Sequence, residues 1–187
     1  NYAFSGCSNL ASIEIPDNVT SIGNYAFQGC SKLANIEIPN SVKTIGERAF
    51  SGCSSLASIK IPNSVTSIGD FAFSECSNLA SSEFPNSVTS IGWGVFSCCS
   101  SLESITVNEE NTYLKTENGV LFSKDMTTLY KYPAKKNLNS YKIPSSVRDI
   151  KEEAFESRSN LARIEIPNSV REIGYGVFSY CSSLESF

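Results

Sequence analysis

A repeat of 23 residues governs this sequence from its first residues onward. Phenylalanine recurs at that interval, and a cysteine follows each phenylalanine three residues later. Columns of leucine, proline, valine and isoleucine keep the same step, and a glycine directly follows the isoleucine of each unit. The first phenylalanine column comprises Phe4, Phe27, Phe50, Phe73 and Phe96. A fixed period of this length is typical of a solenoid, in which each unit buries its apolar residues against its neighbours.

Each unit is expected to contain a strand, a turn and a short helical segment. Ile13 and Ile15 alternate with Glu14, which predicts a strand with both isoleucines facing inward and Glu14 facing outward. The proline that follows ends the strand, because it lacks the N–H that the sheet ladder needs. Residues 24–28 are long enough for one helical turn, and Gly29 stands where a left-handed cap residue is expected.

The regular pattern is interrupted once. Residues 1–107 and 143–187 follow the repeat, and residues 108–142 form an irregular unit. Within that unit, residues 119–122 and 128–132 read as the two strands of a hairpin. Its tyrosines either form a contact patch or fill the core of a thinner coil. They are Tyr113, Tyr130, Tyr132 and Tyr141.

The order of the apolar positions resembles a known family. Leu10-x-x-Ile13-x-Ile15 follows the L-x-x-L-x-L core of leucine-rich repeats, and the phrase I-P-x-S-V-x-x-I-G-x-x-A-F-x-x-C-x-x-L is similar to the BspA-like (Treponema pallidum type) class. This resemblance implies a right-handed solenoid with a parallel sheet on its concave side. The predicted fold is therefore a repeat solenoid of the α/β class, one continuous domain of about eight coils.

The same resemblance implies a function. Members of that class are mostly surface or secreted proteins of bacteria and some protists, associated with adhesion to host matrix proteins or to other cells. We therefore expect a cell-surface or secreted module for protein–protein interaction and adhesion. Two alternatives stay open, namely a rigid spacer that displays another domain and a carbohydrate-binding module. Because the chain starts and stops within a unit and has no initiator methionine or signal peptide, we expect a fragment of a longer protein.

The outward strand positions of the concave sheet are the leading candidate for a binding surface. Neighbouring strands lie about 4.8 Å apart, so these positions are expected to form one polar stripe of mixed charge, roughly 35 Å long. The stripe is either a protein or glycan contact surface or a solvated sheet face without partners. Its members are Glu14, Glu37, Lys60, Glu83, Thr106, Lys142, Arg163 and Glu165.

Two aromatic residues stand where other units carry polar ones. Trp93 and Tyr175 directly follow an Ile-Gly step, at the position that Asn24, Glu47 and Asp70 occupy in other units. Exposed rings at this position either stack on a sugar or a protein partner, or shield the edge of a coil.

The cysteine count is odd. Seven cysteines leave at least one thiol without an intramolecular partner. Six of them share one repeat position beside the phenylalanine and leucine columns, which favours buried free thiols over disulfides between coils. Cys98 lies outside that position, so we expect it to be the exposed and oxidisable thiol.

Composition excludes several classes of function. Histidine is absent, which removes the commonest general base and metal ligand. There is no G-x-S-x-G elbow or glycine-rich phosphate loop, so no catalysis, cofactor or metal is expected. A net charge of −4 without basic runs argues against nucleic acid, and no apolar stretch is long enough for membrane insertion. The expected partner is an extracellular matrix or cell-surface protein, with carbohydrate as the second choice.

Overall fold

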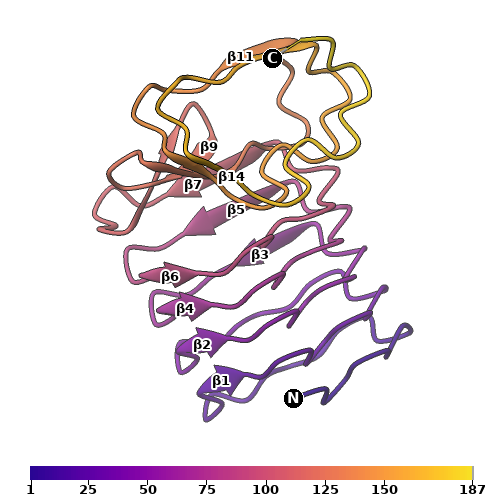
Figure 1. Ribbon diagram of the computed structural model, residues 1–187. Coiled ribbons are helices and arrows are strands. Elements are labelled where there is room, and N and C mark those ends of the chain that lie inside the picture. The colour runs from indigo at the N-terminus through magenta and orange to yellow at the C-terminus, as the bar shows by residue number, and fades with distance from the viewer. Residues whose placement is uncertain (187) are drawn as a thin grey trace.

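The computed structural model describes residues 1–186, which wind into a β-solenoid of about seven turns (Figure 1). Parallel strands of successive coils pair along the stack, as the repeat predicts. About eight coils were expected from the length. The number is lower because part of the irregular unit leaves the coil path and forms antiparallel strands that add no turn.

One side of the solenoid is a ladder of very short strands at the Ser-Ile or Thr-Ile step before each glycine. Ile22, Ile45, Ile68 and Ile91 are in register and point into the core. The glycine that follows allows the coils to touch, since a Cβ atom at Gly69 would lie 2.5 Å from the backbone nitrogen of Glu47. The strands of this sheet are β1 (Ser21–Ile22), β2 (Thr44–Ile45), β4 (Ser67–Ile68) and β6 (Ser90–Ile91).

A second side carries the strands that end at the Ile-Pro step, and we call its outward surface the IP face. The IP face consists of two separate parallel sheets and of residues 12–15 and 35–38, which occupy the same repeat position without being strands. One sheet contains β3 (Ser58–Lys60), β5 (Ser81–Phe84) and β7 (Ser104–Val107). The other contains β11 (Ser140–Lys142) and β13 (Arg163–Glu165).

The third side is made of turns, and the helical segments predicted for it are wrong. No helix is assigned in residues 1–186, so the fold is all-β. Tyr25, Phe27 and Gly29 each donate their backbone N–H to a carbonyl of the next coil, at 2.7–2.8 Å. Two residues of this turn, Tyr25 at φ 59° and Gly29 at φ 70°, are left-handed, which a right-handed helix does not accommodate. The cap conformation predicted for Gly29 is present, but it closes a turn.

The irregular unit contributes an antiparallel meander. It consists of β8 (Leu114–Glu117), β9 (Val120–Ser123) and β10 (Thr128–Lys131). A tight turn through Asn118 and Gly119, both at positive φ, joins the first two of these strands. β10 then pairs in parallel with β12 (Asp149–Ile150), which pairs with β14 (Glu172–Ile173). In Figure 1 the coils before this unit are seen from the side and those after it nearly along their axis, so the stack changes direction here.

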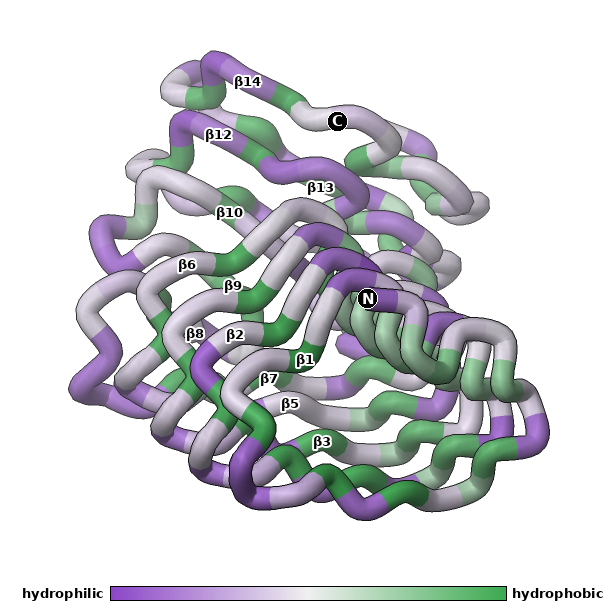
Figure 2. Tube along the Cα trace, turned by 90° about the horizontal axis from the view of Figure 1, so that it is seen from below, coloured by the Kyte–Doolittle hydropathy of each residue, from purple (hydrophilic) through white to green (hydrophobic). Residues whose placement is uncertain are grey.

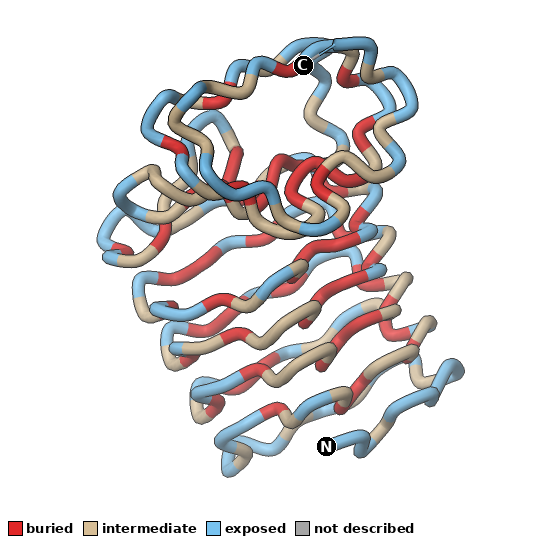
Figure 3. Tube along the Cα trace, in the orientation of Figure 1, coloured by how far each residue is buried: buried red, intermediate tan, exposed pale blue. Residues whose placement is uncertain are grey.

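Columns of apolar side chains fill the interior. Figure 2 shows hydrophobic positions recurring at the same place in successive coils, and Figure 3 shows that they are buried in the middle of the stack. The rings of Phe4, Phe27, Phe50, Phe73 and Phe96 stack with centroids 5.2–5.9 Å apart. Tyr132 continues this column after the interruption, stacked on Phe155 at 5.1 Å.

The repeat-position cysteines lie beside the phenylalanine column. All seven thiols are free, and Cys30, Cys53, Cys76 and Cys99 are buried as predicted. Each of these four Sγ atoms donates a hydrogen bond to the phenylalanine carbonyl of the preceding coil, at 3.1–3.3 Å. Cys7 in the first coil is exposed and Cys181 near the other end is half-buried, because neither has neighbours on both sides.

Candidate functional site

The predicted stripe is only partly assembled on the IP face. All eight of its residues are exposed, but they belong to three groups. Lys60, Glu83 and Thr106 are in register on β3, β5 and β7. Lys142, Arg163 and Glu165 lie on the separate sheet of β11 and β13. Glu14 and Glu37 lie on residues 12–15 and 35–38. The stripe is therefore interrupted where the meander of the irregular unit intervenes.

A groove hollows the IP face over the first three coils. It has a volume of about 640 Å³. Carboxylates of Glu14, Asp17 and Glu37 line it together with the ammonium group of Lys60. Isoleucines and prolines of the same segments also line it, together with Asn40 and Asn63, so the groove offers both polar and apolar contacts.

Charges are paired differently in the groups of the stripe. On the second sheet, Lys142 Nζ lies 3.2 Å from Glu165 Oε2, and Arg163 Nη2 lies 4.0 Å from Glu165 Oε1. No ion pair within residues 1–186 involves Glu14, Glu37, Lys60 or Glu83. These four stripe charges of the first four coils are therefore unpaired, whereas Glu165 partly offsets the charges of Lys142 and Arg163 on β11 and β13.

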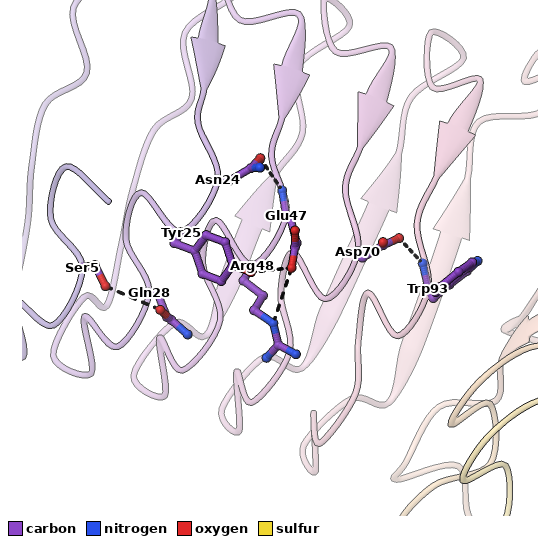
Figure 4. Close-up of polar contacts among 8 residues, drawn as sticks. All are labelled: Ser5, Asn24, Tyr25, Gln28, Glu47, Arg48, Asp70 and Trp93. Carbon is purple, nitrogen blue, oxygen red and sulfur yellow. Dashed lines mark hydrogen bonds and ion pairs between the residues drawn. The ribbon is translucent and has the colours of Figure 1, made fainter. Parts of the chain in front are cut away.

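The two singled-out aromatic residues lie at the corner between the glycine step and the turns. Asn24 Oδ1 accepts a hydrogen bond from the backbone N–H of Glu47 at 3.0 Å, and Asp70 Oδ1 accepts one from Trp93 N–H at 2.9 Å (Figure 4). The Trp93 ring is 56% exposed and Tyr175 is 84% exposed. Both rings therefore face solvent and do not cover the core.

Sequence reasoning missed a surface ladder at the next residue of this corner. Tyr2 and Tyr25 are stacked with centroids 4.6 Å apart, and Arg48 lies 4.6 Å from the centroid of the Phe71 ring. Tyr25 Oη donates to Glu47 Oε1 at 2.5 Å, which raises the pKa of Tyr25 (Figure 4). The ladder residues differ in type, so only their spacing of 23 in the sequence could have indicated that they are in contact.

A polar cluster lies where the two parts of the stack meet. Buried Glu156 accepts hydrogen bonds from the Cys98 backbone N–H at 2.8 Å and from Cys98 Sγ at 3.2 Å. Lys131 is buried nearby and donates to the carbonyl of Glu153 at 2.8 Å, and burial lowers its pKa. Residues 94–104 and 176–186 differ only at Cys98 and Tyr180, so the thiol stands at the one changed position.

The surroundings of Cys98 bear on the expectation that it is exposed and oxidisable. The residue is exposed, as predicted. Burial of the sulfur and its bond to Glu156 raise the pKa of the thiol to about 12, however, so it stays protonated at neutral pH. Because the thiolate is the reactive form, we expect slow oxidation and slow alkylation of this thiol.

The four tyrosines of the irregular unit serve packing. Tyr132 is fully buried, and Tyr141 is half-buried against the same core cluster. Tyr113 and Tyr130 are half-buried against the core cluster of the first coils. Tyr113 and Tyr130 share a hydrogen bond between their hydroxyl groups at 3.0 Å. This arrangement favours a packing role for these rings over a contact patch.

No helix of the described residues has the length and apolar character needed to cross a bilayer. Residues 1–186 also contain no group of three or more acidic or cysteine side chains arranged to hold a metal ion.

Comparison with known proteins identifies the repeat. The model of the BspA type leucine rich repeat region matches residues 1–127 and 127–187, in six copies. No curated protein matches the chain. A leucine-rich repeat protein of Eubacterium ventriosum has a similar structure, with a TM-score of 0.78 and 27% identity. That match covers 90% of this chain and 51% of the Eubacterium chain.

Two further solved structures are similar. A leucine rich cell surface protein from Faecalibacterium prausnitzii is 30% identical with a TM-score of 0.63, over 94% of this chain and 60% of that one. The leucine rich repeat protein of T. pallidum is 32% identical with a TM-score of 0.62, over 98% of this chain and 69% of that one. The chain thus spans about half to two thirds of the length of these proteins. With its repeat matched from end to end, the chain belongs to the BspA type leucine-rich repeat family.

Proposed function

We propose that this chain is the protein-binding part of a cell-surface or secreted bacterial protein and that it mediates adhesion through the IP face of its first four coils. Leucine-rich repeat modules of this kind fit protein interaction, since solenoids offer extended surfaces that follow the stack. One relative is described as a cell surface protein, which supports the proposed location. An extracellular matrix or cell-surface protein is the proposed partner.

The observation that carries this proposal is the set of charges without partners beside the groove. Opposite charges that lie close together partly cancel the field that a ligand meets, although an exposed pair itself is worth only about 0–1 kcal/mol. Glu14, Glu37, Lys60 and Glu83 have no such partner and lie on or next to a groove lined by polar and apolar residues. Charged groups steer the approach of a partner, and apolar residues supply the buried contact that holds it.

The test is binding of the chain to a panel of immobilised extracellular-matrix proteins and bacterial surfaces. We compare it with a variant carrying Glu14→Ala, Glu37→Ala, Lys60→Ala and Glu83→Ala. These exposed changes leave the free energy of unfolding nearly unchanged. Saturable binding that weakens by at least about tenfold in the variant supports the proposal.

A matched control carries Lys142→Ala, Arg163→Ala and Glu165→Ala on β11 and β13. Its binding is expected to equal that of the parent chain, because those charges are paired with one another. Equal loss in both variants would point to nonspecific electrostatics. No binding to any surface would contradict adhesion by this chain and favour the rigid spacer.

A second candidate function is carbohydrate binding at Trp93 and Tyr175. The observation in its favour is the exposure of both rings, because exposed aromatic faces stack on sugars. A glycan array probed with the parent chain, Trp93→Ala and Tyr175→Ala tests it. Tyr180→Ala is the matched control, since that ring is 78% exposed outside this corner position. Glycan signals that survive both corner substitutions would exclude this candidate.

A further inference from the structure

The backbone of the first two coils is unpaired on the IP face. Residues 12–15 and 35–38 stand at the repeat position that forms β3, β5 and β7 in the coils that follow. Their N–H and C=O groups make no hydrogen bond within the described residues. Figure 1 accordingly shows arrows for β3, β5 and β7 but none at this position in the two coils below. The sheet ends at β3, whose outer edge is open.

Three of the four isoleucines in the same region are less buried than their equivalents, whereas Ile38 is 5% exposed. Ile13, Ile15 and Ile36 are half-buried, whereas Ile59 in β3 is 5% exposed and Ile105 in β7 is 1% exposed. The other side of these coils is regular, because β1 and β2 pair in register there. The coils are therefore held together at the glycine step and open on the IP face.

Two hollows occupy the place where the ladder is missing. One is the groove of about 640 Å³ described above. The other, of about 380 Å³, lies between residues 13, 35–37 and β3 and is lined by Ser58 and Lys60 on the strand side. Unpaired backbone groups thus stand next to open space, which is the situation in which a sheet edge accepts a further strand.

We propose that this open part of the IP face binds an extended, positively charged peptide segment of the partner protein by strand addition. The inference rests on the proposed function and names the partner's chemistry at the same site. Backbone hydrogen bonds to residues 12–15, 35–38 or the edge of β3 hold the segment, and alternate side chains of the segment reach the groove. Glu14, Asp17 and Glu37 outnumber Lys60 there, so lysine or arginine is favoured at those alternate positions.

The probe is a fluorescent octapeptide of alternating lysine and valine, titrated with the chain by fluorescence anisotropy at about 150 mM salt. Two control peptides distinguish recognition through backbone hydrogen bonds from recognition through charge. One has the same sequence with N-methyl groups on alternate residues, which removes N–H donors and keeps the charge. The other replaces lysine with glutamate. We expect saturable binding of the first peptide only, with a loss of at least about tenfold for each control.

Two variants of the chain locate the site. Glu14→Gln with Glu37→Gln removes two groove charges at constant shape and is expected to weaken peptide binding by at least about tenfold. Glu165→Gln removes one carboxylate from the paired group on the second sheet and is expected to leave binding unchanged. A carbonyl-labelled peptide whose infrared amide band moves to the β-sheet position on binding confirms the strand geometry.

Several outcomes overturn the inference. Equal binding of the N-methylated peptide would mean that charge alone is recognised, and equal binding of the glutamate peptide would remove the charge preference. A dimer of the chain that excludes the peptide would show that a second copy occupies the open edge. If matrix proteins bind through the IP face while no peptide does, the proposed function stands and strand addition fails. If the peptide binds and no matrix protein does, the adhesion proposal fails instead.

Discussion

Certain turn positions require a left-handed backbone conformation, whatever side chain occupies them. Two positions in each turn are left-handed, and one of them is glycine in the first three coils, at Gly6, Gly29 and Gly52. Glu75 holds the same position in the fourth coil at φ 60°. A side chain in this conformation costs about 1 kcal/mol relative to glycine. The turn of the fourth coil is therefore less stable than those of the first three.

Replacing Glu75 with glycine is therefore expected to stabilise the fold. Glu75 is exposed, and both of its hydrogen bonds among the described residues use backbone groups, which the substitution keeps. Its N–H donates to the Ser97 carbonyl, and its carbonyl accepts from the Ser77 N–H. We expect the free energy of unfolding to rise by about 0.5–1 kcal/mol in urea denaturation. Gly52→Ala is the matched control and is expected to lower it by a similar amount, because φ there is 75°. A loss of stability in Glu75→Gly would contradict this account of the turn.

The reactivity of Cys98 is a second prediction at this scale. Because its pKa is raised to about 12 from 9.0, alkylation by iodoacetamide at pH 8 is expected to be far slower than for a thiol in the unfolded chain. Glu156→Gln removes the carboxylate that accepts from the thiol and is expected to speed the reaction. Mass spectrometry of the modified peptide across pH 7–11 measures the rate. Fast alkylation of the parent chain at pH 8 would show that the thiol is not held by Glu156.

Residues facing the core were predictable because the repeat places them in columns. Buried residues of the irregular unit were not predictable, because they lie outside these columns. Asn111 is fully buried, where its amide donates to the carbonyls of Pro85 and Val88 and its Oδ1 accepts from Tyr113 and Leu114. In the sequence it is one polar residue among several in a loop, and nothing marks it as a core residue.

At the scale of elements, the hairpin of residues 119–122 and 128–132 could be predicted, but the place of its second strand in the coil could not. The phrase Tyr130–Pro133 looks like an Ile-Pro strand, but Leu129 pairs with Ile150 and so occupies the isoleucine position before the glycine step. Tyr132 consequently falls in the phenylalanine column. The place of this strand in the coil depends on its pairing with Asp149–Ile150, about 20 residues later in the sequence.

Arg158 shows how the following coil adapts to the irregular one. It occupies the cysteine position, is fully buried, and lies 4.9 Å from the centroid of the Tyr132 ring. Its guanidinium donates to the carbonyl of Pro133 at 2.7 Å and to that of Lys136. The long side chain thus reaches carbonyls that a cysteine would not reach.

Arg158→Ala is expected to destabilise the chain by about 3 kcal/mol or more. The substitution leaves two carbonyls without these donors and a cavity beneath Tyr132. Thermal and urea unfolding measure the change. Arg163→Ala is the control, because that guanidinium is largely exposed and 4.0 Å from its partner, and its effect is expected to stay within about 0.5 kcal/mol. Equal effects of the two substitutions would contradict a structural role for Arg158.

Across the whole molecule, the cysteine column makes stability depend on alkaline pH. Burial raises the pKa of Cys53 and Cys99 to about 12, and that of Cys76 rises well above 9.0. Below pH 9 both folded and unfolded thiols are protonated, so this contribution is complete. Above pH 9 only the unfolded thiols ionise, and stability falls as pH rises towards 12.

The expected fall is up to about 1.4 kcal/mol per pH unit for each buried thiol. Urea unfolding at pH 8, 9, 10 and 11 measures it. A variant with Cys53→Ala and Cys76→Ala is expected to start from a lower stability and to show a shallower slope, which separates the thiols from the buried tyrosines. An unchanged slope in this variant would assign the alkaline loss to other groups.

The overall architecture followed from the period because every regular coil repeats the same contacts. Three features did not follow from the period. They are the change of stack direction, the split of the IP face into two sheets, and the open backbone of the first two coils. The repeat residues Ile13, Ile36 and Ile59 look alike in sequence, yet only Ile59 lies in a paired strand. Pairing depends on the local spacing of coils, which no single residue encodes.

The ladders between coils also determine how the molecule responds to tension. Their hydrogen bonds run along the stack, so a pull at the two ends loads them one coil after another, as a zipper opens. Each detached coil would release about 75 Å of extended chain. A solenoid anchored between two bodies in a flowing liquid would therefore lengthen in steps, and each step would relieve the force on its attachments.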